Sequence, residues 1–267
     1  MAHKLGAAHY FKKEKAFELI HSGILDILKL PKSVKLSDQQ GIQVTAIRSG
    51  KTHIERLGIK SFLSQLNYPI YYLDFETMGT AIPLFDDVRP YQQVPFQFSL
   101  HIIQKPGYKP RHESFLAEGR IDPRPEILKR LKRVLGDHGS IVAYNASFET
   151  GKLRASCEVY KEYSSWFEKI EERIVDLLSP FKSFYYYHPK QMGSASIKSV
   201  LPALTGKGYE GMDIAEGGTA SNEFLRVTFG EVIAEKERST VRKNLEEYCK
   251  LDTLAMVEIV NKLQSSS

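Results

Sequence analysis

Two carboxylates stand one residue apart in the segment IYYLDFET, residues 70–77. Its apolar and aromatic start predicts a buried β-strand. Alternation along that strand would put Asp74 and Glu76 on one face and Leu73 and Phe75 on the core face. Neighbouring carboxylates repel each other unless a cation lies between them, and hard divalent ions such as Mg²⁺ or Mn²⁺ take oxygen ligands. The segment therefore indicates a candidate cation site, with an ordinary pair of surface acids at a strand end as the alternative.

A third acid follows a second short apolar segment, SIVAYN at residues 140–145, which predicts a buried strand. We expect Ser147 to cap the helix that comes next, and Glu149 to lie in the first turn of that helix. A carboxylate at this point would stand where a strand meets a helix, near the edge of the sheet. The alternative is an acid that only favours the positive end of the helix dipole.

A fourth acid belongs to the last predicted helix, residues 240–264. Tyr248 and Asp252 are four residues apart, so they share one face of that helix. This spacing places a phenol beside a carboxylate, although a Tyr–Asp pair half in solvent has the same pattern.

The hydrophobic pattern around these acids predicts a mixed α/β plan, with three strands as a meander followed by a helix, a strand and further helices. The expected strands are residues 70–75, 94–104, 111–116 and 140–145, and the expected helices are 10–31, 52–66, 124–136, 147–160, 164–181, 222–236 and 240–264. Residues 32–50 are expected to form a linker or a short strand, and residues 185–196 a loop.

Composition excludes several classes of protein. No apolar run reaches the roughly 18 residues that a membrane span needs, and no signal peptide is expected at the N-terminus. Cys157 and Cys249 form no disulfide framework or CxxC pair, so we expect a reducing, cytoplasmic setting. The net charge is +5, and residues 1–70 hold 11 Lys or Arg against 5 Asp or Glu. This basic excess is compatible with a polyanion partner or with a solvated helix face.

Taken together, DFE at 74–76, NASFE at 145–149 and YCKLD at 248–252 resemble the DEDD superfamily of 3′–5′ exonucleases. Because the residue five before Asp252 is Glu247 and not His, the resemblance is to the Tyr-type branch. The longer phrases YPIYYLDFET, RPYQQVPFQFSLH, YNASFE, GSASIKSVLPAL and YCKLDTLAM resemble DUF2779, a bacterial family of unknown function placed in that superfamily. This narrower resemblance covers residues from about 55 to the C-terminus.

The resemblance implies a ribonuclease-H-like fold of class α/β, a mixed β-sheet flanked by helices. It would occupy residues 56–267, and residues 1–55 would form a basic helical arm and linker, the tail of a larger architecture or a docking element for a partner. The implied activity is hydrolysis of phosphodiester bonds of DNA or RNA, at a single-stranded 3′ end. The alternative is a weakly active or inactive module that keeps the nuclease fold and binds nucleic acid or a protein partner.

The resemblance also implies two divalent ions, Mg²⁺ or Mn²⁺. Asp74 would bridge both ions, Glu76 and Asp252 would complete the first site, and Tyr248 would orient the attacking water. Glu149 would hold the outer ion, although the superfamily usually has Asp at this position.

Asp176 is the competing third acid, and we expect it to support the site from outside the ligand shell. Candidate substrate contacts are Thr77, Asn145 and Lys198. The last of these follows GSAS at a helix start, where backbone N–H groups could face a phosphate or simply belong to an ordinary capped helix.

Overall fold

The computed structural model describes residues 13–231 and 233–266. These residues form two compact units. The first unit comprises residues 13–64, 178–208 and 258–266 of the described chain, and the second, which we call the sheet unit, comprises Gln65–Leu177 and Tyr209–Val257. The predicted division at residue 55 stays a prediction, and the first twelve residues of the predicted arm lie outside the described residues.

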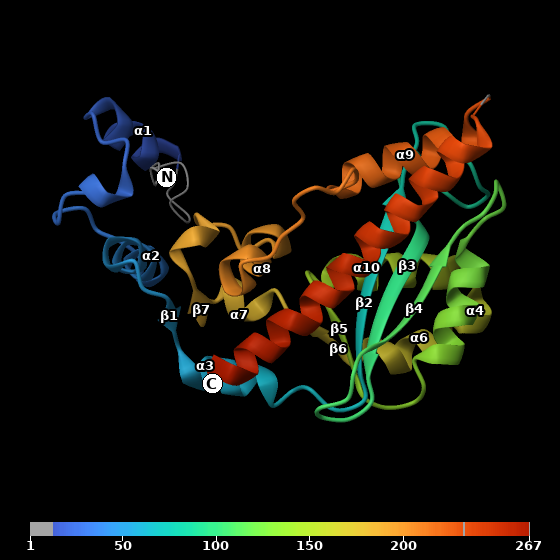
Figure 1. Ribbon diagram of the computed structural model, residues 1–267, viewed down its shortest axis with the longest axis horizontal. Coiled ribbons are helices and arrows are strands. Elements are labelled where there is room, and N and C mark those ends of the chain that lie inside the picture. Colours follow the sequence, from blue (N-terminus) through green and yellow to red (C-terminus); the bar gives the residue numbers. More distant parts are fainter. Residues whose placement is uncertain (1–12, 232, 267) are drawn as a thin grey trace. The chain divides into compact units, whose positions relative to one another are not determined.

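A five-stranded mixed sheet is the centre of the sheet unit, in the order β4-β3-β2-β5-β6 (Figure 1). The bounds of the strands are β2 Ile70–Met78, β3 Val94–Ile103, β4 Arg111–Leu116, β5 Ser140–Ala143 and β6 Ile174–Asp176. Strands β2, β3 and β4 form an antiparallel meander, while β5 runs parallel to β2 and β6 runs parallel to β5. The predicted meander and the α/β class are confirmed.

One face of the sheet packs on α4 (Arg124–Val134), α5 (Ser147–Val159) and α6 (Ser164–Glu171). The inward side chains alternate along the strands, as the period of two requires. On β2 they are Tyr71, Leu73 and Phe75, and on β3 they are Phe98, Leu100 and Ile102. At about 1.5–3 kcal/mol for each fully buried large apolar side chain, this cluster contributes most of the stability on this face.

The opposite face carries α9 (Gly217–Phe229) and α10 (Glu235–Ser266), and α10 crosses β2 and β3 in the view of Figure 1. The register of β2 with β3 shifts between Glu76 and Thr77, which pair with Gln97 and Pro95, so Phe96 is an extra residue. The ring of Phe96 stacks on that of Phe224 of α9, with centroids 3.9 Å apart. The bulge therefore anchors α9 beside the end of β2 that carries the acids.

The first unit is mainly helical. Its elements are α1 Lys13–His21, η2 Ile27–Lys29, α2 Asp38–Ser49, β1 His53–Ile54, α3 Arg56–Leu63, α7 Ser179–Lys182, β7 Tyr186–Tyr187, η4 Pro189–Gln191 and α8 Ile197–Thr205. The 3₁₀ turn η3, Lys161–Tyr163, belongs to the sheet unit. The prediction of a linker or short strand over residues 32–50 is wrong, because α2 fills most of it. Ser37 and Gln40 form a capping box that starts this helix.

The prediction of one continuous helix over residues 164–181 is also wrong. Helix α6 ends at Glu171, and Ile174–Asp176 forms β6, the edge strand beside β5. A strand of three residues is too short to show a period of two, so its sequence cannot be told from a continuing helix. Likewise, the helix expected over residues 222–236 ends at Phe229, before Gly230 in an extended conformation.

None of the helices in the described part of the chain combines the length and hydrophobicity that crossing a bilayer requires.

Gly139 tests how β5 is held beside β2. Its φ is +88°, and a Cβ added there would collide with the backbone nitrogen and carbonyl oxygen of Pro69. We predict that Gly139→Ala lowers the free energy of unfolding by more than about 2 kcal/mol, because both the left-handed backbone and the close approach require glycine. Urea unfolding measures this change.

Gly151→Ala is the matched control, since Gly151 is exposed on α5 and has no atom within 4 Å of an added Cβ. This variant is expected to be neutral or more stable by up to about 1 kcal/mol. Equal unfolding midpoints for the Gly139→Ala variant and the wild type would contradict the close packing at Pro69.

Candidate functional site

The two acids of β2 lie on the face of the sheet that α10 covers. Leu73 and Phe75 are buried in the hydrophobic cluster on the other face, as predicted, and Asp74 and Glu76 alternate with them. Glu76 is 6% exposed. The sulfur of Cys249, on α10, lies 3.5 Å from Oδ2 of Asp74. Strand and helix therefore enclose these carboxylates between them.

Hydrogen bonds from β3 fix the position of α10 along the strands. Gln97 donates from Nε2 to the carbonyl oxygen of Leu245 over 2.9 Å, and Ser99 shares a 2.7 Å hydrogen bond with the hydroxyl of Thr253. In the register of the sheet, Gln97 is the partner of Glu76, and Ser99 is the partner of Asp74. The contacts lie on either side of the helical turn that carries Tyr248 and Asp252, so they hold that turn opposite the two acids.

Asp252 is 6% exposed and accepts a hydrogen bond of 2.5 Å from the hydroxyl of Tyr209 to its Oδ1. Tyr209 comes from the segment that precedes α9, and its ring centroid lies 6.3 Å from that of Tyr248. Two phenols therefore flank this carboxylate, one four residues earlier on the same helix and one from a loop. Sequence reasoning missed Tyr209, because nothing in its surrounding sequence indicates proximity to α10.

A left-handed residue turns the chain from β5 into α5 and brings Glu149 into place. Asn145 has a φ of +68°, a conformation that Asn adopts more easily than most residues. Asp176 of β6 accepts hydrogen bonds at Oδ1 from the backbone N–H groups of Asn145 (3.0 Å) and Ala146 (3.3 Å). Asp176 therefore holds the start of α5, and its expected place outside the ligand shell stays a prediction.

The expectation that Ser147 caps α5 is wrong. Ser147 is the first helical residue, and its hydroxyl donates to Oδ1 of Asn145 over 3.1 Å. The hydroxyl is used within the turn, and the backbone N–H groups there bond to the carboxylate of Asp176, which the local sequence could not reveal.

Glu149 lies in the first turn of α5, as predicted, and is 3% exposed. Its Oε2 is buried and has no hydrogen-bond partner. Burial, and then the charge of Asp176, raise the pKa of Glu149 to about 8, although a backbone hydrogen bond and nearby Lys152 act in the opposite direction. A buried carboxylate oxygen without a partner is costly, so it is a position where a cation would be stabilising.

The charges of the predicted acids act on one another. Burial raises the pKa of Asp74 well above its usual range, and Asp252, Glu76 and Glu149 raise it further, in that order. Burial also raises the pKa of Tyr248, followed by the charges of Asp252, Glu76 and Asp74. The structure thus brings the four acids from β2, α5 and α10, and Tyr248 with them, into one electrostatic cluster, which we call the acid cluster.

The three candidate substrate contacts, Thr77, Asn145 and Lys198, do not all lie in the unit that holds the acid cluster. Thr77 donates a 2.8 Å hydrogen bond to Oε1 of Gln93 at the end of β2, and Asn145 forms the turn before α5. Lys198 is the second residue of α8, in the first unit and not in the sheet unit. Sequence reasoning also missed Cys249, which stands three residues before Asp252 and hence on the same side of α10.

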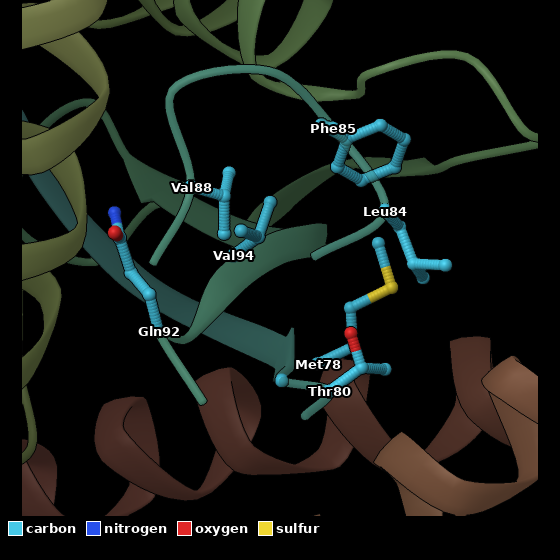
Figure 2. A pocket seen from close by; sticks show the side chains of 8 residues that line it. Met78, Thr80, Leu84, Phe85, Val88, Gln92 and Val94 are labelled. Atoms are coloured by element: carbon cyan, nitrogen blue, oxygen red, sulfur yellow. The ribbon is translucent and has the colours of Figure 1, made fainter. Parts of the chain in front are cut away.

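The loop that follows the acids of β2 folds over a hollow of about 10 Å³, drawn in Figure 2. The hollow is large enough for about one water molecule and is too small for a nucleotide. Its lining residues are Met78, Gly79, Thr80, Leu84, Phe85, Val88, Gln92 and Val94.

The raised pKa of Glu149 predicts how the stability of the metal-free protein depends on pH. Between the ordinary value of 4.5 and about 8, the folded protein keeps a proton that the unfolded chain has lost. The folded state binds more protons, so stability is fully present below about pH 4.5 and falls as the pH rises toward 8, by up to about 1.4 kcal/mol per pH unit.

Glu149→Gln should make this decline shallower, because the amide has no proton to lose, while the raised pKa of Asp74 still contributes a decline of the same sign. Glu158→Gln, at an exposed position on the same helix, should leave it unchanged. Urea unfolding in the presence of a chelator, from pH 5 to pH 8.5, measures both variants. A wild-type protein that becomes more stable from pH 5 to 8 would contradict this prediction.

Comparisons with known proteins give similarity without a described activity. Residues 71–196, which include Asp74, Glu76 and Glu149, match the family described as "Domain of unknown function (DUF2779)". The chain is 26% identical over 219 residues to "Uncharacterized protein MG366 homolog" of Mycoplasma pneumoniae, and 25% identical over 225 residues to "Uncharacterized protein MG366" of Mycoplasma genitalium.

These matches cover 75% and 77% of this chain but 33% of each relative, so the chain spans about a third of the length of the curated relatives it matches. No solved structure matches the chain. The predicted resemblance to DUF2779 is therefore confirmed for residues 71–196, which hold three of the four acids.

Proposed function

We propose that the sheet unit is a metal-dependent phosphodiesterase that acts as a 3′–5′ exonuclease on DNA or RNA. The observation that carries this proposal is the acid cluster, in which β2, α5 and α10 contribute carboxylates that raise the pKa of Asp74 together. The alternative, an ordinary pair of surface acids at the end of β2, does not account for the acids that α5 and α10 add to the cluster. The sheet order, with an antiparallel meander followed by two parallel strands, is compatible with the ribonuclease-H-like fold that the sequence resemblance implies.

The residues fit divalent cations. The donors are carboxylate oxygens, which Mg²⁺ and Mn²⁺ prefer, and one of them, Oε2 of Glu149, is buried without a hydrogen-bond partner. Like charges at close range cannot all ionise without a counter-charge. Asp74, Glu76, Glu149 and Asp252 would hold the ions. When bound, two such ions would supply a water of lowered pKa and stabilise the negative charge on the attacking and leaving oxygens.

Tyr248 serves as a hydrogen-bond donor and not as a base. Burial and the neighbouring carboxylates raise its pKa, so the phenol keeps its proton at neutral pH. A protonated phenol beside Asp252 can orient a water molecule toward a phosphate, which is the role that the resemblance implies for it. Tyr209, which donates to Oδ1 of Asp252, keeps that carboxylate in one orientation.

Helix α9 begins beside Glu76, and its start would contact an anionic substrate. A Cβ added to Gly217 would lie 3.6 Å from Oε2 of Glu76, and one added to Gly218 would meet no atom within 4 Å. Backbone N–H groups at a helix start favour phosphate. On α5, the charge of Lys152 acts on Glu149, so a cation also stands beside the acids. These groups can offset the charge that a phosphodiester would bring to the site.

A cleavage assay on 5′-end-labelled DNA and RNA oligonucleotides tests this function. With Mg²⁺ or Mn²⁺ we expect a ladder of products shortened from the 3′ end, which a chelator abolishes. Asp74→Asn and Asp252→Asn should lower the rate by more than roughly 100-fold, beyond the loss typical of a residue outside the ligand shell. Tyr248→Phe should cause a smaller loss, because positioning and not metal binding is removed.

Asp137→Asn is the matched control, since Asp137 is exposed in the loop between α4 and β5, and its activity should equal that of the wild type. Equal cleavage by the wild type and the Asp74→Asn variant would show that a contaminating nuclease causes the cleavage, and would refute the proposal. Metal-independent binding of the oligonucleotides without cleavage would favour the alternative of an inactive nucleic-acid-binding module.

A further inference from the structure

A thiol is part of the acid cluster, and the chemistry above does not use it. The sulfur of Cys249 and one carboxylate oxygen each from Asp74 and Glu76 lie within 4.8 Å of one another. The thiol donates to Oδ2 of Asp74 across 3.5 Å. Cys249 is fully buried, and it projects from α10 toward β2, between the turns that carry Leu245 and Thr253. Two oxygens and one sulfur thus face a common point.

This donor set selects a different class of cation from an all-oxygen set. Mg²⁺ binds oxygen and gains little from sulfur, whereas thiolates favour borderline and soft ions, of which Zn²⁺ is the common one in proteins. With bonds of about 2.3 Å to sulfur and about 2.0 Å to oxygen at a tetrahedral angle, the two donor atoms of one Zn²⁺ stand about 3.5 Å apart. The sulfur of Cys249 and Oδ2 of Asp74 have this separation.

A second observation points to a cation in the acid cluster. Oε2 of Glu149 is buried without a hydrogen-bond partner, and the charge of Glu149 is among those that raise the pKa of Asp74. Glu149 therefore supplies an unsatisfied negative donor from a third element. The three donors that lie within 4.8 Å of one another come from β2 and α10 and include a sulfur, which distinguishes them from a cluster of acids alone.

The other cysteine of the chain has none of these surroundings. Cys157 of α5 packs in the hydrophobic cluster on the opposite face of the sheet, with Leu153 and Phe167. It is a buried thiol of the ordinary structural kind, so it provides a control of matched chemistry and matched burial.

We propose that Cys249 is a metal ligand, and that Cys249, Asp74 and Glu76 together hold a borderline cation of the Zn²⁺ class, in preference to Mg²⁺. This inference rests on the proposed role of Asp74 and Glu76 in cation binding. The thiol loses its proton to solvent as the sulfur–metal bond forms, with no change of oxidation state. Glu149 and Asp252 remain to bind a second, oxygen-bound Mg²⁺ or Mn²⁺, so Zn²⁺ would set the metal preference of the first position.

Titration of the metal-free full chain with Co²⁺, a spectroscopic substitute for Zn²⁺, tests the ligand directly. We expect a thiolate-to-cobalt charge-transfer absorption in the near ultraviolet that saturates at one ion per chain and disappears when Zn²⁺ displaces Co²⁺. Cys157→Ser should keep this absorption, whereas Cys249→Ser should lose it. The loss of Zn²⁺ affinity in Cys249→Ser should exceed the roughly 100-fold that loss of an outer partner can cost.

Circular dichroism of Cys249→Ser verifies that the fold is retained, and the wild-type spectrum is informative without any variant. Calorimetric binding of Co²⁺ to the wild type without charge-transfer absorption would overturn the proposal, and would leave Cys249 as a hydrogen-bond donor to Asp74. That result together with Mg²⁺-dependent cleavage would leave the proposed nuclease function standing. The absorption without cleavage of any oligonucleotide would support the ligand and refute the nuclease.

Discussion

Repulsion between carboxylates that are close together and shielded from water is the constraint on which the sheet unit depends. Asp74 and Glu76 of β2 lie opposite the turn of α10 that carries Asp252, and the charges of Asp252, Glu76 and Glu149 all act on Asp74. Burying a charge is costly unless it is neutralised. Without a cation, the raised pKa values of Asp74 and Glu149 show that protonation would relieve the repulsion. A bound divalent cation would relieve it with the carboxylates ionised, and the fold must keep them together in either case.

The scaffold resists this repulsion with apolar packing on both faces of the sheet and with a few buried polar contacts. The hydrophobic cluster under α4, α5 and α6 stabilises β2 from behind, and the cluster of α9 and α10 closes the acidic side. Buried hydrogen bonds from Gln97 and Ser99 to α10 prevent the helix from sliding along the strands. Asp176 fixes the turn before α5. Each of these contacts touches the element that carries an acid and not the acid itself, as positioning of a reactive site requires.

The sequence was sufficient to predict β2 and the helix face of Tyr248 and Asp252, which carry acids of the site. It was insufficient to predict β6 and α2. Strand β2 has an apolar run in which acidic and core-facing side chains alternate, and the four-residue spacing of Tyr248 and Asp252 defines a helix face, so local rules located both. Strand β6 has only three residues, so its hydrophobic pattern has no measurable period. Only its pairing with β5 in the structure identifies it as a strand at the edge of the sheet. Helix α2 was missed because its amphipathic pattern is weak, and its start depends on the capping box of Ser37 and Gln40.

Residues that reach the site through tertiary contacts escaped sequence reasoning for the same reason. Tyr209 is distant from Asp252 in the chain, and only the path of the segment before α9 brings its hydroxyl to that carboxylate. Cys249 has no partner cysteine in sequence, and its significance comes from the strand that α10 covers. Ser147 shows the converse case, since its sequence position suits a cap while Asp176, distant in sequence, bonds to the N–H groups at the start of α5.

Titration of the metal-free protein with Mn²⁺, followed by calorimetry and by electron paramagnetic resonance, is the most direct measurement of whether the acid cluster is a cation centre. The proposed function predicts two Mn²⁺ ions per chain, which Asp74, Glu76, Glu149 and Asp252 would hold close enough together for magnetic coupling. Glu149→Gln should lose one ion, whereas Glu158→Gln should keep both. Binding of no Mn²⁺ by the folded wild type, or an unchanged number of ions in Glu149→Gln, would contradict a centre built from these four carboxylates.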